Sequence, residues 1–435
     1  MDKLLEISES RGCRAEVFGI RTKSTEMEKT NGSVNAVSAS IQSGVSLRVI
    51  KNGKTGMAYT KNLINREELV DNALASLEAG VEAGFDFPES GALEFTEEYD
   101  DTIEGMGFPE LREQIEELEA LYGGVTRGIV SLRAGCGTTE ITIRNTSGAN
   151  LMQKDSEVYR MGLVMYPGSS TDIGNVFRGR SKAVIHEPDV KRTLGFFRDS
   201  LPEIKIGEGR MKVLVLPDVL YAFTWRLGSA ASAKAFHEKI SPLMNKKGQQ
   251  VISSLLSLIS DPTTAHADRR LFDDEGVQTR RVPIFENGVF TSAYNNLDYA
   301  AKLSEKPLGT GFRGGMWGGD KISLSPSPSL SYANFQPGAK SFEEMLSMID
   351  RGVIVHGLLG AHSGNILNGD LSVGLNPGLY VENGEIVGRV KDGMMAGNVY
   401  DMLSKAVAVE SGLHYTGSVF QDPSILLNDI SVVGA

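Results

Sequence analysis

His237-Glu238 is the residue pair in this chain whose types most resemble a metal site. Zinc peptidases place such a pair on a helix with a second histidine one turn later, and the glutamate acts as general base. Here position i+4 is Ser241, and Pro242 disfavours a helical conformation at Ser241 and ends the helix. One imidazole remains where three protein ligands are usual, so the pattern favours a solvated or hydrogen-bonded His237. The other downstream histidines could supply ligands only through an unusual arrangement: His266, His356, His362 and His414.

The densest cluster of acidic residues is Asp273-Asp274-Glu275, which Gly276 follows. Carboxylates at this spacing could hold Ca²⁺ or Mg²⁺ if further oxygens converged on them from elsewhere. A turn rich in Asp and closed by Gly has the same composition without any ligand. We therefore expect a turn here.

Motifs for nucleotide binding and for nucleophilic hydrolysis are incomplete. The run from Gly309 to Gly314 matches G-x-G-x-x-G, but Pro307 precedes it and more glycines follow, so no helix can begin there to receive a phosphate. Asn52-Gly53-Lys54-Thr55 resembles the end of a P-loop, although a hairpin turn explains Asn52-Gly53 better. No nucleophile elbow occurs, and His362 and Ser363 are adjacent, which would place them on opposite faces of a strand. A triad built from distant residues stays open.

Composition indicates a soluble protein of a reducing compartment. Lys and Arg number 44 against 55 Asp and Glu, so the net charge is -11, and the densest basic stretches are short, which argues against direct nucleic-acid binding. Cys13 and Cys136 lie far apart and are expected to be buried thiols. Acidic residues interrupt the N-terminus where a signal peptide needs an apolar run, and residues 352–369 are too polar to span a bilayer. We expect a cytoplasmic protein without membrane contact.

The first half of the sequence predicts an antiparallel meander covered by helices. β-branched residues cluster over the first sixty residues, with hairpin dipeptides at Asn31-Gly32 and Asn52-Gly53. Helical spacing follows at 65–83 and at 110–122, with an irregular connector over 85–105 between them. Strands return over 129–184, and a further helix is expected over 189–198.

The second half predicts a buried strand, a helix and a series of hairpins. Residues 213–216 read as the strand, and Pro217 opens a helix from 218 to about 239. Asn287-Gly288 and Asn383-Gly384 each separate two β segments. Because the helices are segregated from the hairpins, the fold class is α+β with antiparallel sheets. We divide the chain into an N-terminal α+β meander domain (1–205) and a hairpin-rich, β-rich C-terminal domain (206–435).

Several segments, taken in order, resemble the TldD/PmbA family. They are the end of the meander (44–49 and 56–60), Phe272-Asp273-Asp274-Glu275-Gly276-Val277 with Phe285-Glu286-Asn287-Gly288-Val289, and 368–372 with 381–386. Each segment alone consists mostly of residues that are common in turns and is weakly specific. Together the segments occur in the order of the family and span nearly the whole chain. The resemblance implies a pair of subunits, in which TldD is a zinc peptidase and PmbA, or TldE, lacks the metal motif. The family has also been labelled a modulator of DNA gyrase.

The departures from TldD indicate which subunit this chain resembles. Phe236 to Ser241 is similar to a stretch that follows the His-Glu-x-x-x-His motif of TldD by about a dozen residues, which would place that motif near 225–230, where neither His nor Glu occurs. TldD also carries a cysteine ligand near its C-terminus, whereas no cysteine follows Cys136 here and His414 begins the corresponding region. The chain therefore resembles PmbA, and no catalytic, metal or cofactor residue is assigned; His237 and Glu238 stay the only metal candidates.

The resemblance implies a non-catalytic subunit of a TldD-type cytoplasmic metallopeptidase complex. Its expected partners are a TldD-like subunit, which would hold the zinc, and a peptide or unfolded protein substrate; alone it would form a homodimer. Exposed strand edges could bind extended peptides through main-chain hydrogen bonds. Two alternatives stay open: a homo-oligomeric binding or regulatory protein of the gyrase-modulator type, and an independent hydrolase with an unrecognised site. The sequence leaves the substrate and the stoichiometry undetermined.

Overall fold

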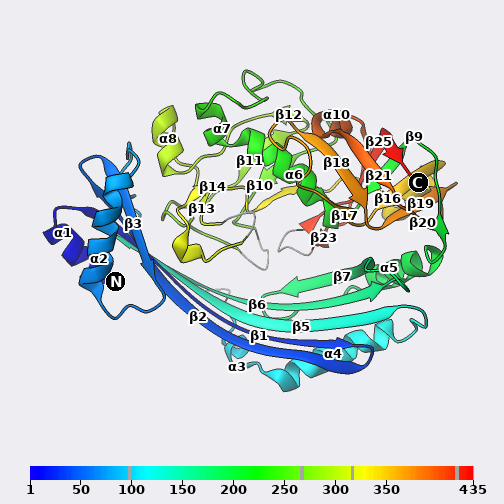
Figure 1. Ribbon diagram of the computed structural model, residues 1–435, viewed down its shortest axis with the longest axis horizontal. Helices are drawn as coiled ribbons and strands as arrows, with labels where there is room; N and C mark the ends of the chain where they lie inside the picture. Colours follow the sequence, from blue (N-terminus) through cyan, green and yellow to red (C-terminus); the bar gives the residue numbers. More distant parts are fainter. Residues whose placement is uncertain (97–98, 265–268, 315–317, 417–420, 435) are drawn as a thin grey trace.

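A curved antiparallel sheet forms the N-terminal half of the protein (Figure 1). The computed structural model describes residues 1–96, 99–264, 269–314, 318–416 and 421–434. In these residues the sheet has seven strands: β1 (Arg14–Thr30), β2 (Ser33–Lys51), β3 (Lys54–Thr60), β4 (Ala92–Phe95), β5 (Ile129–Asn145), β6 (Asn150–Met165) and β7 (Asp172–Gly179). Their order is β3-β2-β1-β5-β6-β4, and β7 also pairs with β6. The turns Asn31-Gly32 and Asn52-Gly53 have positive φ at every residue, which confirms both predicted hairpins.

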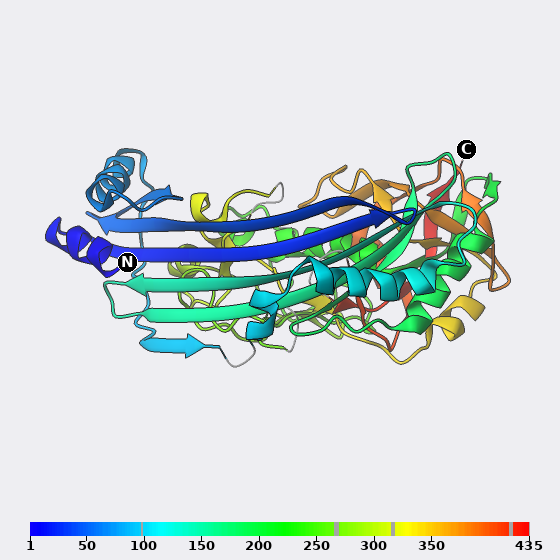
Figure 2. The ribbon, with the colours of Figure 1, turned by 90° about the horizontal axis from the view of Figure 1, so that it is seen from below.

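Helices cover parts of the curved sheet. They are α1 (Asp2–Ser10), α2 (Arg66–Ala75) with the 3₁₀ turn η1 (Ser76–Ala79), α3 (Asp101–Gly105), α4 (Phe108–Tyr122) and α5 (Glu187–Asp199). Helix α4 lies against the convex face (Figure 2) and buries Leu111, Ile115, Leu118 and Tyr122, which recur at helical spacing. The concave face is turned toward the C-terminal half (Figure 1).

Two local predictions for this half were wrong in detail. The helix expected over 65–83 ends earlier, because α2 tightens into η1 and Gly80 takes up an extended conformation. The connector 85–105 contains β4, which pairs with β6 in parallel, and α3, whose first turn is capped by the Asp100 side chain. Pairing with a distant strand is a tertiary interaction, so the local composition could not reveal β4.

The C-terminal half is built on a second, mixed sheet. Among the described residues it contains ten strands: β8 (Glu203–Ile204), β9 (Gly209–Val215), β16 (Arg351–Val355), β17 (Leu358–Leu359), β18 (Asp370–Leu375), β19 (Gly378–Glu382), β20 (Glu385–Val390), β21 (Met394–Asn398), β22 (Ala406–Val409) and β25 (Ile425–Val433). The order is β17-β18-β21-β25-β9-β16-β19-β20-β8, and β22 also pairs with β25. Strand β17 is therefore an end strand of this sheet.

Smaller elements surround this sheet. The strands are β10 (Leu258–Ser260), β11 (Val282–Glu286), β12 (Val289–Phe290) and β15 (Ala333–Phe335) in one sheet, and the pairs β13 (Gly311–Phe312) with β14 (Ser327–Pro328) and β23 (His414–Tyr415) with β24 (Gln421–Asp422). The helices are α6 (Pro217–Ala231), α7 (Ala233–His237), α8 (Leu297–Leu303), α9 (Phe342–Ser347), α10 (Val399–Ser404) and the 3₁₀ turn η2 (Lys321–Ser323). Both predicted hairpins are present, with turns at Asn287-Gly288 and Asn383-Gly384.

The helix predicted over 218–239 is broken into α6 and α7. Ser232 is extended, with φ -67° and ψ 132°, and its hydroxyl caps α7 by accepting a hydrogen bond from the backbone N–H of Lys234 at 3.3 Å. Tyr294 pairs with the same point of the chain, since its backbone C=O accepts from the N–H of Ala233 at 2.9 Å. The break is therefore fixed by a contact about sixty residues away in sequence, which helical periodicity alone does not reveal.

The architecture confirms the α+β class, with mainly antiparallel sheets and segregated helices; β9 with β16, β8 with β20 and β4 with β6 are the parallel pairs among the described strands. The division at residues 205 and 206 stays a prediction; β8 precedes it and pairs with β20 of the second sheet. Within the described part of the chain, none of the helices combines the length and the apolar character that crossing a bilayer requires.

A buried cluster of ion pairs joins the curved sheet to the C-terminal half. Arg48 on β2 donates to both carboxylate oxygens of Glu16 on β1 at 2.9 Å, and to Glu275 at 3.0 Å. Burial opposes the charge on Arg48, but the carboxylates of Glu16 and Glu275 outweigh it and hold its pKa above the usual value. Arg313 lies beside them, 3.6 Å from Glu16, and donates to the Ser46 hydroxyl. Each of these residues is buried, with at most 6% of its surface exposed.

This cluster explains two motifs of the sequence. The Asp273 carboxylate accepts hydrogen bonds from the backbone N–H groups of Glu275 and Val277, so the predicted acidic turn is present. The same carboxylate accepts from the N–H of Gly311, and Asp274 accepts from the N–H of Arg313 at 2.7 Å. The G-x-G-x-x-G run therefore holds the acidic turn in place, and β13 occupies the position where a dinucleotide fold would begin a helix.

Candidate functional site: two cavities beside helix α6

One face of α6 lines a cavity in the C-terminal half. Its stripe consists of residues at helical spacing: Tyr221, Thr224, Trp225, Gly228 and Ser229. The opposite face of the helix is buried in the core, where Phe223 and Leu227 are fully covered. The cavity has a volume of about 790 Å³, and its far walls are residues 327–331 and 358–362. We call this cavity the α6 groove.

The described lining of the α6 groove combines hydroxyl groups with apolar side chains and contains no carboxylate. Hydroxyl groups of serine, threonine and tyrosine alternate with Trp225, Leu330 and Leu359, and His362 is the one ionisable side chain that is not a tyrosine in its described lining. Leu359 belongs to the end strand β17 and is 58% exposed. An extended peptide could therefore meet both an apolar surface and a strand edge here.

Arg226 lies within the segment 225–230 but has a structural role. It is fully buried, and its guanidinium donates to the backbone C=O groups of Ala222, Ser363 and Asp370 at 2.7–2.9 Å. These bonds fasten the turn after β17 to α6. Arg226 is therefore a structural residue that shapes one wall of the groove.

The structure separates the metal candidates from both cavities. His237 and Glu238 are exposed at the end of α7. The imidazole of His237 packs edge-on against the ring of Tyr299, and the two ring centroids are 6.0 Å apart. His362 and Ser363 lie in a turn and not in a strand, so the argument from opposite strand faces does not apply to them. His266 lies outside the described residues. Among the residues described, His, Cys, Asp and Glu side chains form no group of three that could hold a metal ion.

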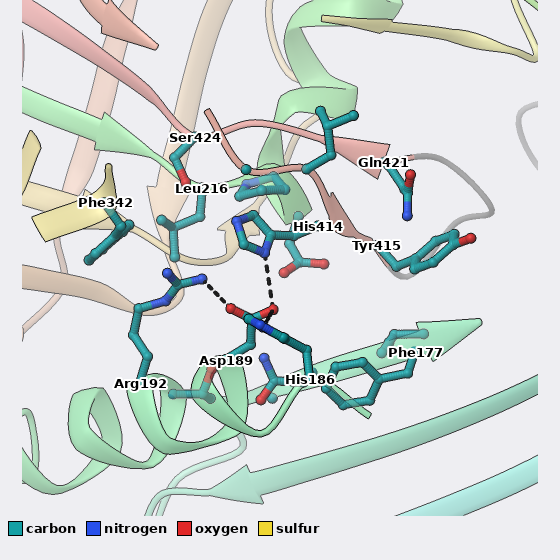
Figure 3. Close-up of a pocket in the computed structure, with 18 of the residues that line it drawn as sticks. Phe177, His186, Asp189, Arg192, Leu216, Phe342, His414, Tyr415, Gln421 and Ser424 are labelled. Carbon is teal, nitrogen blue, oxygen red and sulfur yellow. Dashed lines mark hydrogen bonds and ion pairs between the residues drawn. The ribbon is translucent and has the colours of Figure 1, made fainter. Parts of the chain in front are cut away.

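The second cavity lies where α5 and β7 meet the first turn of α6, residues 412–415, Gln421 and Ser424 (Figure 3). Its volume is about 360 Å³. Three of the histidines in the described chain line it, namely His186, His356 and His414. His356 is buried, and that burial lowers its pKa to about 4, so it is neutral at physiological pH.

His414 is held between two carboxylates in this cavity. Its Nδ1 lies 3.2 Å from Asp189 of α5 (Figure 3), and its Nε2 lies 3.0 Å from Glu410. Arg192 donates to Asp189 at 2.9 Å and lies 3.6 Å from Glu410, so both carboxylates face two cations. Burial alone would lower the pKa of His414, but the hydrogen bonds to Asp189 and Glu410 raise it to about 9.

This geometry determines what His414 can do. Both ring nitrogens donate to carboxylates, so the imidazolium has no lone pair for a metal ion or for proton abstraction. The pKa of Asp189 is correspondingly low: burial would raise it, but the hydrogen bond and charge of His414, the charge of Arg192 and the hydrogen bond from His186 together outweigh burial and bring it to about 2. The network therefore fastens the segment from Glu410 to His414 onto α5, and it is not a catalytic triad.

The charge on His414 predicts a pH dependence of stability. Since its folded pKa of about 9 lies above the unfolded value of about 6.5, its contribution is complete below pH 6.5 and disappears as the pH rises through 9. The shift corresponds to about 3 kcal/mol. We expect His414→Gln to destabilise the protein most near pH 6, and the gap to wild type to close by pH 9.5. Urea titrations at both pH values measure the gap; an equal gap at the two would contradict the assignment.

Sequence reasoning missed the partners of His414. Asp189 lies 225 residues away, and the only local signals were the i,i+4 spacing of Glu410 and His414 and the i,i+3 spacing of Asp189 and Arg192. Both spacings are common on protein surfaces. The site becomes visible only when the fold brings α5 against the C-terminal segment.

Family models match two parts of the chain. The model for the C-terminal domain of PmbA/TldA metallopeptidases matches residues 208–434, more than half of the chain, and the model for domain 1 of these metallopeptidases matches residues 15–77. The chain belongs to the PmbA/TldD family. This finding confirms the resemblance and places the protein among metalloprotease-type proteins.

Individual relatives in the PmbA/TldD family cover nearly the entire chain. A metalloprotease of Methanothermobacter thermautotrophicus is 26% identical over 415 residues, which are 90% of this chain and 86% of the relative. A proposed modulator of a DNA gyrase from Thermotoga maritima is 26% identical, with a TM-score of 0.82 over 99% of this chain and 98% of its own. TldE from Thermococcus kodakarensis shares the fold over the whole of both chains, with a TM-score of 0.88 at 22% identity.

Proposed function

We propose that this chain is a PmbA/TldE-like, non-catalytic subunit of a TldD-type metallopeptidase complex in the cytoplasm. The observation that carries the proposal is the α6 stripe. The segment 225–230, which by resemblance corresponds to the zinc motif of TldD, supplies Trp225, Gly228 and Ser229 to the groove and buries Arg226. Neither a metal ligand nor a general base stands on this face of the helix.

The C-terminal segment supports the same assignment. By resemblance, the region beginning at His414 corresponds to that of the cysteine ligand of TldD. Here His414 is an imidazolium fixed by Asp189 and Glu410, which leaves no lone pair for zinc. Two separate positions thus lack the chemistry of a peptidase centre, and the α6 groove lies along the first of them.

Peptide binding is the activity that the α6 groove would contribute. Hydroxyl groups and backbone along residues 327–331 and the end strand β17 offer hydrogen bonds to an extended main chain, and Trp225 and Leu359 offer apolar contact. Such contacts make few demands on side-chain identity. This chain would hold or extend an unfolded peptide, and the zinc subunit would cleave it.

Affinity capture from the native host tests the subunit assignment. We expect the tagged chain to retain a TldD-like subunit, identified by mass spectrometry, and zinc to accompany that subunit. The chain purified alone should hold well under one zinc per molecule after dialysis against a weak chelator, because a lone exposed imidazole binds Zn²⁺ weakly.

Two outcomes would contradict the assignment. About one zinc per isolated chain, lost in the His237→Ala variant, would show that this chain carries its own metal centre. Capture of copies of this chain without a TldD-like subunit would favour the homo-oligomeric regulatory alternative.

A further inference from the structure

The charge of the α6 groove distinguishes it from three other cavities of the described chain. Asp, Glu, Lys and Arg make up 23% of the sequence, yet none of them occurs in the described lining of the groove. His362 is the imidazole in this lining, and it is exposed. The other cavities are lined by Asp189, Arg192 and Asp218, by Arg21, Lys61 and Glu140, and by Lys23, Asp155, Glu157, Arg270 and Lys321.

Hydroxyl groups supply the polarity of the groove in place of charges. The Ser329 and Ser331 hydroxyls lie 2.5 Å apart and bond to each other, so the accepting hydroxyl keeps its own proton for a further bond. The Thr224 hydroxyl oxygen is covered and has no hydrogen-bond partner among the described residues. Because buried hydroxyl groups are rarely left unpaired, the Thr224 hydroxyl requires a partner from water or from a ligand in the groove.

Apolar side chains form the rest of the lining, and α6 makes room for one of them. A Cβ atom at Gly228 would lie 3.2 Å from Cδ1 of Leu330, so the missing side chain lets Leu330 approach the helix. Trp225 lies on the same face of α6, and Leu359 of the end strand β17 is 58% exposed. The described lining thus offers neutral hydrogen bonds and apolar contact, without a counter-charge of either sign.

Such a lining discriminates against charged ligands. An ammonium or carboxylate group that enters the groove loses part of its hydration and gains no ion pair, because hydroxyl groups carry only partial charges. A neutral amide loses less hydration, and hydroxyl and backbone groups of the lining can replace its hydrogen bonds to water. The penalty therefore applies to both signs of charge.

We propose that the α6 groove selects peptide segments that carry no charged side chain. The inference rests on the proposed peptide-binding role of this chain and names the class of segment that the groove accepts. The backbone of the segment bonds to the end strand β17 and to the hydroxyl groups, and its apolar side chains contact Trp225, Leu330 and Leu359. A volume of about 790 Å³ is typical of sites for small ligands, so the selected segment is short.

Three unfolded peptides test the proposal. They carry the same fluorophore and differ only in having Gln, Glu or Lys at every third position of an otherwise uncharged sequence, so that no register keeps the varied residue out of the groove. Binding to the isolated chain is measured by fluorescence anisotropy. The Gln peptide should bind at least about tenfold more tightly than either charged peptide. The net charge of -11 by itself would favour the Lys peptide, so a weaker Lys peptide identifies the lining as the cause.

A carboxylate placed in the groove should reverse this preference. Ser229→Asp adds a negative charge to the α6 face of the groove, so the variant should bind the Lys peptide more tightly than the Gln peptide. Ser254→Asp is the matched control, since Ser254 is exposed and lies outside the described lining, and this variant should keep the wild-type order. The same reversal in both variants would place the binding outside the groove and overturn the proposal.

The possible failures are distinguishable. If none of the three peptides bound to the wild-type chain, the peptide-binding role itself would be overturned. If the wild-type chain bound the Lys peptide as tightly as the Gln peptide, selection against charge would be overturned and the peptide-binding role would stand. The comparison on the wild-type chain decides the matter even if Ser229→Asp folds poorly. Capture of the zinc subunit is a separate result that none of these outcomes changes.

Discussion

Arg48→Met should destabilise the protein by about 3–5 kcal/mol, the largest effect expected of any single substitution here. Arg48 is the cation that hydrogen-bonds to both Glu16 and Glu275, and its removal leaves Glu275 without its ion-pair partner and Glu16 with Arg313 alone. Arg313 compensates only in part, since it lies 3.6 Å from Glu16 and its NH1 group donates to Ser46 and Leu324. Chemical denaturation followed by circular dichroism measures the loss.

A matched surface pair provides the control for this substitution. Arg210 donates to Asp429 at 2.6 Å, but both side chains are about half exposed, so Arg210→Met should destabilise the protein far less than Arg48→Met. The double variant Arg48→Met with Glu16→Met should recover part of the loss, because it removes one orphaned charge. If Arg48→Met and Arg210→Met lowered the free energy of unfolding equally, the role of the cluster as the connection between the two halves would be contradicted.

Local chemistry made the hairpins and the fold class predictable. The Asn-Gly dipeptides at 31–32, 52–53, 287–288 and 383–384 require positive φ at both residues, and each is a turn between antiparallel strands. The same reasoning placed α4 correctly, because its buried residues recur at helical spacing. A structure that is determined by a few neighbouring residues, such as a hairpin turn or a helix, can therefore be predicted from the sequence alone.

Long-range contacts account for what was missed. Arg48 and Glu275 are 227 residues apart, and nothing near either residue indicates that they meet. Asp273-Asp274-Glu275 read correctly as a turn, but its burial and its contacts with the Gly309–Gly314 run depend on the packing of the two halves. The break between α6 and α7 likewise depends on Tyr294.

The sequence indicated the candidate site only through the residues of the TldD zinc site that this chain lacks. The segment 225–230 could be recognised as lacking His and Glu, yet its position along the α6 groove required the fold. His414 was noted as one of the downstream histidines and as the start of the region where TldD carries a cysteine ligand. Its ion pairs with Asp189 and Glu410 came from the structure.

The second large effect concerns peptide cleavage. This chain alone should not hydrolyse an unfolded peptide, because the α6 stripe lacks the ligands and the base that a peptidase requires, and removal of a general acid or base alone costs about 10²–10⁴-fold. Addition of a metal-competent TldD-like subunit should produce cleavage at least about 100-fold above this chain alone. His237→Ala should change that activity only modestly, because His237 is exposed and lies outside both cavities.

Exchange of metal-depleted subunits tests the central claim most directly. Each subunit is stripped of zinc separately, and cleavage of one fluorogenic unfolded peptide is measured in every combination of stripped and untreated subunits. We predict that activity disappears whenever the TldD-like subunit is stripped and is unchanged when only this chain is stripped. Chelator-sensitive cleavage by this chain alone would contradict the account, and chelator-insensitive cleavage by this chain alone would show instead an independent hydrolase.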